Sequence, residues 1–161
     1  MKKRKIDLQL DCRVKSVNAG EDGKVSQVIT ANGEIYTDAV VIAAGVRPRI
    51  GLAQNTGLEI GTTGAIKVDS HLRTSDPFIF AAGDCASQIN SISGREVYIP
   101  LASTANKQGR VVANNIAGLN TEFNGVMGTT VLQAFDFNIG RTGLGEQEAK
   151  SLGYNVISGI T

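Results

Sequence analysis

The sequence has few of the residues that several common protein classes need. It holds no tryptophan, one histidine (His71) and two cysteines, Cys12 and Cys85, without a C-x-x-C pair. A zinc site or a disulfide framework is excluded, because each needs clustered cysteine or histidine ligands. No apolar run approaches the ~18 residues that cross a bilayer, and the basic start lacks the apolar core of a signal peptide. We expect a cytoplasmic protein without a metal.

Charge of one sign is also missing. Lysine and arginine total 16 against 15 aspartate and glutamate, a formal net charge of +1. Such a chain has no field to hold nucleic acid or an anionic membrane by charge alone. We therefore expect a small-molecule substrate rather than a nucleic-acid or membrane partner. The length of 161 residues predicts room for one domain of ordinary size and not for two.

Residue patterns predict an antiparallel meander at the start of the chain. Residues 6–14 alternate apolar and polar side chains, which is typical of a half-buried strand with Cys12 on its apolar face. Residues 25–30 predict a second strand. Asn32-Gly33 is a strong signal for a two-residue hairpin, and residues 34–36 predict the returning strand.

Two apolar runs without alternation, residues 39–45 and 78–82, predict strands buried on both faces, as in a parallel sheet. Residues 65–69 alternate and predict a short strand. The second apolar run stops at Gly83-Asp84. A carboxylate at the carboxyl end of such a strand lies where open α/β sheets bind ligands.

The second half of the chain predicts its longest helix, at residues 101–116. Pro100 and Gly118 mark its two ends. Further on, residues 129–135 predict a strand, residues 146–152 a short helix stopped by Gly153, and the last residues another strand. The apolar face of the long helix is predicted from steps of three and four residues, at Leu101, Ala105, Gln108, Val112 and Ile116.

Four segments carry a resemblance to one family: TSDPFIFAAGD at 74–84, AAG at 43–45 with Pro48, PLASTANKQGR at 100–110 continuing to Gly118, and RTGLGE at 141–146 with Ala149. The first resembles the second FAD-binding motif of the flavin-dependent pyridine-nucleotide disulfide oxidoreductases. The second resembles the point where their NAD(P)-binding domain returns to the FAD domain. The last two are similar to the NADH oxidase, NADH peroxidase and coenzyme A disulfide reductase branch.

The resemblance implies the fold class and the order of domains. We expect an α/β, partial FAD/NAD(P)-binding Rossmann-like fold with an antiparallel meander, plus the start of an α+β dimerisation domain. Residues 1–47 would end the NAD(P)-binding domain, residues 48–124 would form the returning part of the FAD domain, and residues 125–161 would begin the dimerisation domain. Family members also carry two G-x-G-x-x-G fingerprints and a redox cysteine, which are missing here. We therefore interpret the chain as an interior segment of a longer enzyme.

The resemblance also implies FAD and NAD(P)H as cofactors of the parent enzyme. Asp84 would accept hydrogen bonds from the ribityl hydroxyls, and Gly83 would allow close approach of the backbone. The N–H groups at the start of the long helix would stabilise negative charge on the N1 and C2 carbonyl side of a reduced isoalloxazine ring. The alternative for Asp84 is a turn or cap. The candidate cofactor-binding residues are Ala44, Gly45, Gly83, Asp84, Leu101 and Ala102.

No catalytic residue is assigned within these 161 residues. Cys85 follows Asp84, but the family's redox cysteine belongs to an N-terminal part, so a buried structural thiol is the better interpretation. Cys12 is expected in the core. His71 has no partner at suggestive spacing and is expected in a surface loop, while Lys107 and Arg110 are expected on a solvated face.

Three functional hypotheses remain. The leading one is a homodimeric flavoprotein that passes electrons from NAD(P)H through FAD to a disulfide, peroxide or oxygen. The chain alone would be inactive, either with or without bound FAD. The second is a non-catalytic fragment that serves structure or self-association. The third is a ferredoxin- or rubredoxin-type reductase, against which residues 104–110 and 141–146 argue.

Overall fold

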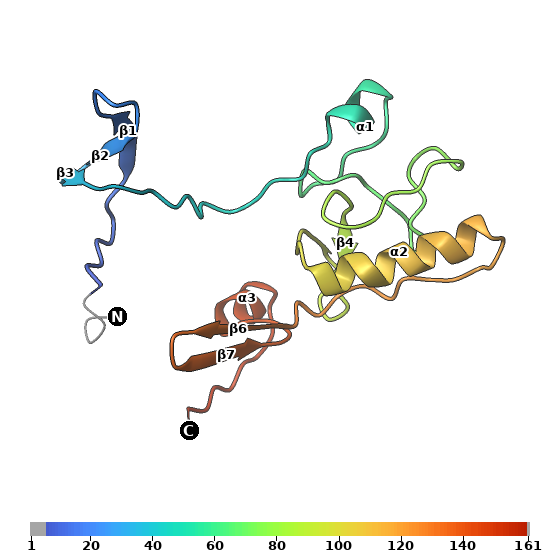
Figure 1. Ribbon diagram of the computed structural model, residues 1–161. Helices are drawn as coiled ribbons and strands as arrows, with labels where there is room; N and C mark the ends of the chain where they lie inside the picture. Colours follow the sequence, from blue (N-terminus) through green and yellow to red (C-terminus); the bar gives the residue numbers. More distant parts are fainter. Residues whose placement is uncertain (1–5, 161) are drawn as a thin grey trace. The chain divides into compact units, whose positions relative to one another are not determined.

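The computed structural model describes residues 6–160, and the chain divides into two compact units, Met1–Gly45 and Val46–Thr161 (Figure 1). The single domain predicted from length is therefore wrong, because length limits the size of a core but does not fix how many units a chain forms. Within residues 6–160 no helix is long and apolar enough to cross a membrane. The mixture of helices and antiparallel strands confirms the predicted α/β class.

The first unit is a three-stranded antiparallel sheet of β1 (Val14–Ala19), β2 (Val25–Thr30) and β3 (Gly33–Tyr36), in the order β1-β2-β3. The predicted meander is confirmed, but its first strand is not where the alternation placed it. A strand over residues 6–14 is wrong: β1 begins at Val14, and Asp11 interrupts the preceding segment with a left-handed φ of 52°. Alternation marks two faces but does not supply a neighbouring strand.

The hairpin between β2 and β3 is confirmed, with Thr30 paired to Gly33. Ala31 and Asn32 form the loop, one position earlier than the Asn-Gly dipeptide suggests, and Gly33 takes φ 139°. The buried Thr30 closes the loop: its Oγ1 donates to the Gly33 carbonyl at 2.8 Å and accepts the Asn32 N–H at 3.2 Å. A side chain therefore fixes this turn as firmly as the glycine does.

The two apolar runs predicted as buried strands are not strands. Residues 39–45 are irregular and Val41 is 91% exposed. In residues 78–82 only an isolated bridge from Phe80 to Arg73 forms, and Phe78 is 91% exposed. The reason is that a doubly buried strand needs partners on both edges and layers on both faces, and among residues 6–160 neither run has them.

Two smaller strand predictions also fail. Residues 65–69 carry isolated bridges from Ile66 to Ile60 and to Ala86 instead of a strand. The last described residues, up to 160, are irregular. The predicted domain boundaries at residues 47 and 124 stay a prediction.

The second unit builds a core of mostly small side chains. Ala53 of α1 (Gly51–Asn55), Ile66, Ala81 and Ala86 are buried together. The unit continues through a two-stranded ladder, β4 (Gln88–Ile89) with β5 (Glu96–Val97), and then α2 (Ala102–Ile116). The predicted long helix is confirmed within one residue.

Residues 129–152 follow two of the predictions. The strand β6 (Thr130–Ala134) pairs antiparallel with β7 (Phe137–Arg141), and α3 (Glu146–Ser151) follows. Arg141 and Glu148 form an ion pair at 3.0 Å between β7 and α3. The strand and the short helix expected from local sequence are both confirmed.

Gly125 gives the first testable prediction. Its φ is +80°, and a Cβ there would lie 2.4 Å from the Ile89 carbonyl oxygen, which already accepts the Val126 N–H. We expect Gly125→Ala to lower the free energy of unfolding by about 2–4 kcal/mol, from left-handed strain plus overpacking.

Gly64→Ala is the matched control, since Gly64 has φ +83° and open space around its Cα. It should cost about 1 kcal/mol, the conformational part alone. Urea unfolding of both variants measures the difference. Equal losses would show that the Ile89 carbonyl yields to the added methyl group.

Candidate functional site

The start of α2 exposes backbone donors without a neutralising group. Its N-cap, Leu101, is extended (φ −134°, ψ 130°), no side chain caps the helix, and the first turn holds no acidic residue. Leu101 is half-buried and Ala102 is exposed. The unsatisfied N–H groups and the positive end of the helix dipole therefore remain available to an anionic or carbonyl-bearing ligand.

The buried face of α2 differs from the predicted apolar stripe. The buried residues are Thr104, Gln108 and Val111, whereas Ile116 is 69% exposed. Ala105 and Val112 are half-buried. The predicted stripe contains one polar residue, Gln108, whereas two of the three residues that are buried are polar. Gln108 belongs to both sets, and its side chain is fully buried.

The Gly83-Asp84 turn lies against this face. The Gly83 N–H donates to Gln108 Oε1 at 2.8 Å, and a Cβ at Gly83 would lie 3.6 Å from the Ala105 Cβ. Gly83 has φ +82°, a conformation that glycine adopts without strain. Asp84 is exposed. The turn therefore presents a free carboxylate beside the first two turns of α2.

Backbone hydrogen bonds fix both flanks of the turn. Before it, the Ala81 N–H donates to the Leu72 carbonyl at 3.1 Å. After it, the Ile66 N–H donates to the Cys85 carbonyl at 2.8 Å, and the Ser87 N–H to the Ile66 carbonyl at 2.8 Å. The predicted strand is absent, yet its end is held in place by these bonds.

Tyr98 is a neighbour of the turn that sequence reasoning missed. It is half-buried and, with Leu101, Met127 and Arg141, lines a cavity of about 420 Å³. Burial raises the pKa of the Tyr98 phenol above 10.0, and the negative charges of Asp84 and Cys85 raise it further. No sequence signal marks Tyr98, because it lies 14 residues after Asp84 in an irregular segment.

The Tyr98 phenol gives the second prediction. Since its folded pKa is raised, the stability it contributes is complete below pH 10 and is lost as the pH rises through the folded value. We expect the tyrosinate absorbance of Tyr98 to titrate above pH 10.0 in the 161-residue chain. The contribution of Tyr98 is identified as the part of the absorbance that is lost in Tyr98→Phe.

Asp84→Asn isolates the second cause of the shift. Removing the carboxylate should lower the pKa of Tyr98 while burial keeps it above the ordinary value. Asp38→Asn, a change at an exposed aspartate of the other unit, should leave the titration unchanged. An identical Tyr98 titration with and without the Asp84 carboxylate would contradict the described geometry.

The two cysteines occupy different surroundings. Cys85 is half-buried, packs against the core of the second unit, and donates through Sγ to the Ala82 carbonyl at 3.4 Å. That agrees with a structural thiol. The prediction that Cys12 is a core residue of a strand is wrong. Cys12 is half-buried in an irregular segment, and its Sγ lies 3.5 Å from Gln9 Oε1. Residues 6–160 hold no cluster of side chains suited to a metal ion.

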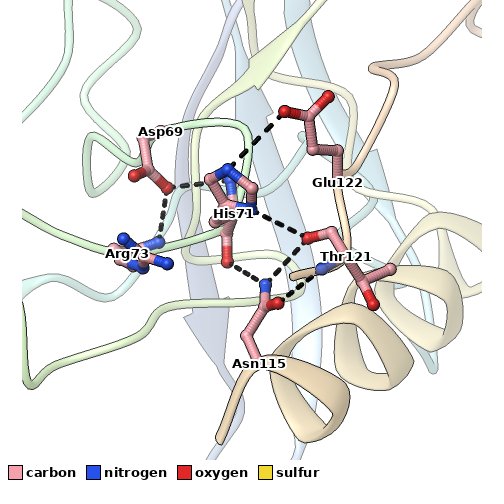
Figure 2. Close-up of polar contacts among 6 residues, drawn as sticks. All are labelled: Asp69, His71, Arg73, Asn115, Thr121 and Glu122. Atoms are coloured by element: carbon pink, nitrogen blue, oxygen red, sulfur yellow. Dashed lines mark hydrogen bonds and ion pairs between the residues drawn. The ribbon is translucent and has the colours of Figure 1, made fainter. Parts of the chain in front are cut away.

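His71 is not the surface residue that the sequence suggested, since its side chain is only 17% exposed. Figure 2 shows it between the loop at Asp69 and the segment that follows α2. Its Nδ1 lies 3.0 Å from the Thr121 carbonyl, which can only accept, so Nδ1 carries a proton. Its Nε2 lies 3.6 Å from Glu122 Oε1.

Asn115 anchors the end of α2 in the same network. Its Nδ2 donates to the His71 and Thr121 carbonyls, both at 2.9 Å, and its Oδ1 accepts the Thr121 N–H at 2.8 Å (Figure 2). Three hydrogen bonds thus fix the carboxyl end of the helix, and Gln108 fixes its second turn. We assign this network a structural role, because the Nδ1 of His71 is already hydrogen-bonded to the Thr121 carbonyl.

Four of the six predicted site residues lie in the second unit. Gly83 and Asp84 form the turn, Leu101 and Ala102 begin α2, and the contacts of Gly83 with Ala105 and Gln108 connect the two segments. Ala44 and Gly45 belong to the first unit. Their assignment to the cofactor, like the roles of the other four, stays a prediction.

Comparisons with known proteins agree with this architecture. The family described as pyridine nucleotide-disulphide oxidoreductase matches residues 1–109. An NAD(P)H sulfur oxidoreductase (CoA-dependent) from Pyrococcus furiosus is 43% identical over 94% of this chain and 34% of its own length, and an NADH oxidase from Enterococcus faecalis is 37% identical over 95% and 34%. The solved NAD-dependent persulfide reductase from A. fulgidus superimposes with a TM-score of 0.86 at 38% identity, over 94% of this chain and 28% of that one.

Each alignment covers a much larger share of this chain than of the relative. The alignments include nearly all of this chain, which spans about a third of the length of the curated relatives. The level of identity and the extent of the family match establish membership. The chain belongs to the pyridine nucleotide-disulphide oxidoreductase family.

Proposed function

We propose that the chain is part of an FAD-dependent NAD(P)H oxidoreductase and contributes to its flavin site. The observation that carries the proposal is the Gly83-Asp84 turn held against an uncapped α2. The turn offers an exposed carboxylate acceptor, and the helix start offers backbone donors. Relatives named as persulfide reductase, sulfur oxidoreductase and NADH oxidase support the reaction class.

The donor and acceptor set fits FAD. The ribityl hydroxyls are hydrogen-bond donors that a carboxylate such as Asp84 accepts well. A reduced isoalloxazine ring carries negative charge, which the N–H groups of Leu101 and Ala102 and the helix dipole would stabilise. When bound, FAD supplies the transfer of a hydride from NAD(P)H and of electrons onward. This chain's own residues would bind FAD and orient it.

The electron acceptor is proposed as a small molecule: a disulfide or persulfide, a peroxide, or oxygen. Within this range the sulfur compounds are favoured by the relative at 43% identity, whose name is a sulfur oxidoreductase. The domain assignment of residues 1–47, 48–124 and 125–161 is retained as part of the proposal. The end of the first unit at Gly45 supports the first boundary.

The test uses the full-length protein purified without added cofactor. We expect a flavin absorption spectrum, and anaerobic NADH or NADPH should bleach it. Oxygen, peroxide and a coenzyme A persulfide, each added alone to the reduced protein, would then identify the acceptor by the return of the flavin band. A protein that contains no flavin and does not bind added FAD would refute the proposal.

Self-association is a further part of the proposal and gives the third prediction. The β6–β7 hairpin exposes Val131 and Phe137, with Leu132 and Ile139, and within residues 6–160 it pairs with no third strand. Exposed apolar area and free strand edges favour pairing with an identical copy. We expect sedimentation equilibrium at micromolar concentration to give a dimer or larger species.

Val131→Lys combined with Phe137→Lys tests whether the hairpin carries this association. The pair places one charge on each face of the hairpin and should shift the chain towards the monomer, because a charge on either face opposes its burial. Lys substitutions at exposed positions of β3, Glu34 and Tyr36, are the matched control and should leave the mass unchanged. A monomer mass of 16.9 kDa for the unmodified chain would remove this part of the proposal.

A further inference from the structure

Gln108 is the most buried polar side chain of α2. It has 0% relative exposure, and its Oε1 accepts the Gly83 N–H at 2.8 Å. Its Nε2 is buried without a hydrogen-bond partner among residues 6–160. A buried amide with an unpaired N–H is unfavourable compared with an apolar side chain of the same shape. Packing alone would therefore be served better by a leucine or methionine at this position.

The bond to Gly83 has a second distinctive property. Among the hydrogen bonds of residues 6–160, it is the one that ties residues 82–84 to α2. The flanking bonds hold Ala81 and Cys85 to other loop segments, and the Ala86 N–H bond to the Gly83 carbonyl is internal to the turn. The distance between the Asp84 carboxylate and the start of α2 therefore depends on this single contact and on the packing of Gly83 against Ala105.

We infer that Gln108 is a positioning residue for the flavin site: it holds the Gly83-Asp84 turn against α2, so that the Asp84 carboxylate and the N–H groups at the helix start act on one ligand. The inference rests on the proposed function. It adds a buried side chain, two helical turns from the start of α2, to the residues that determine flavin affinity. Gln108 acts through the turn and does not itself contact the ligand.

The experiment compares three variants of the full-length protein. Gln108→Met removes the acceptor and retains the length and flexibility of the side chain. Gln108→Glu keeps an oxygen at the position of Oε1 and serves as the rescue. Val111→Ala is the matched control, because Val111 lies on the same buried face and its truncation lowers stability without touching the turn.

Two quantities are measured in each variant. The first is hydrogen exchange of the apo-protein in peptides that cover residues 82–86, which reports protection of the Gly83 amide. The second is the dissociation constant of FAD. We expect Gln108→Met to lose the Gly83 protection and to bind FAD about tenfold more weakly, the worth of one buried hydrogen bond. Val111→Ala should keep both values, and Gln108→Glu should retain more of each than Gln108→Met.

The outcomes separate the inference from the function on which it rests. Unchanged Gly83 protection in Gln108→Met, or equal loss of FAD affinity in Val111→Ala, would overturn the positioning role. Lost protection with unchanged FAD affinity would also overturn it, provided that Asp84→Ala weakens FAD binding in the same assay. If neither Asp84→Ala nor Gln108→Met changes FAD binding, the proposed flavin site itself is refuted.

Discussion

The 161-residue chain by itself is expected to oxidise no NADH or NADPH above the rate of free FAD. Its sequence contains no G-x-G-x-x-G fingerprint after an apolar strand, and such a loop places the pyrophosphate of a dinucleotide at a helix N-terminus. The Gly140–Gly145 segment has a different spacing. Without these loops neither FAD nor NAD(P)H would bind tightly enough for hydride transfer.

The measurement follows the absorbance of NADH and of NADPH in the presence of the purified chain and added FAD. Free FAD at the same concentration is the control for uncatalysed oxidation, and the full-length protein is the positive control. Oxidation by the chain well above the free-flavin rate would contradict this prediction. It would mean that the described residues form both cofactor sites without the fingerprints.

Replacing Asp84 by alanine in the full-length protein is expected to reduce flavin occupancy strongly. The ribityl hydroxyls would lose a charged acceptor, and hydrogen bonds to charged groups contribute about 1.5–3 kcal/mol, which corresponds to about a tenfold to hundredfold loss of affinity. Flavin content is measured by absorbance against protein concentration after gel filtration. Asp84→Asn keeps an acceptor oxygen without the charge, so its flavin content should lie between that of the unmodified protein and that of Asp84→Ala.

Asp38→Ala is the control for loss of an exposed aspartate. Asp38 lies in the first unit, and its substitution should leave flavin content unchanged. Thermal unfolding of each apo-protein separates loss of binding from loss of fold. Full flavin content in Asp84→Ala after gel filtration would show that the carboxylate is not a ligand contact.

The local signals of the sequence determined the elements whose stability is local. The helix α2 follows from its proline and glycine boundaries, the β2–β3 hairpin from Asn32-Gly33, and α3 from its short pattern ending at Gly153. Each depends on neighbours close in sequence: i to i+4 bonds in the helices and a two-residue loop in the hairpin. The TSDPFIFAAGD motif predicted a strand that ends at Gly83-Asp84, whereas the structure has a turn there without the strand, because a motif does not supply the partners of a strand.

Only the tertiary structure decided which apolar segments become strands and which residues are buried. Residues 6–14, 39–45 and 78–82 have strand-like composition, but a strand requires a hydrogen-bonding partner, and the sequence of one segment does not contain that partner. The same holds for Gln108, His71 and Asn115. Gln108 is buried and His71 and Asn115 are half-buried, and the carbonyl and amide groups that they bind lie six or more residues away in the sequence. Contacts at long sequence separation leave no periodic signal, so the fold had to bring these groups together before their roles became visible.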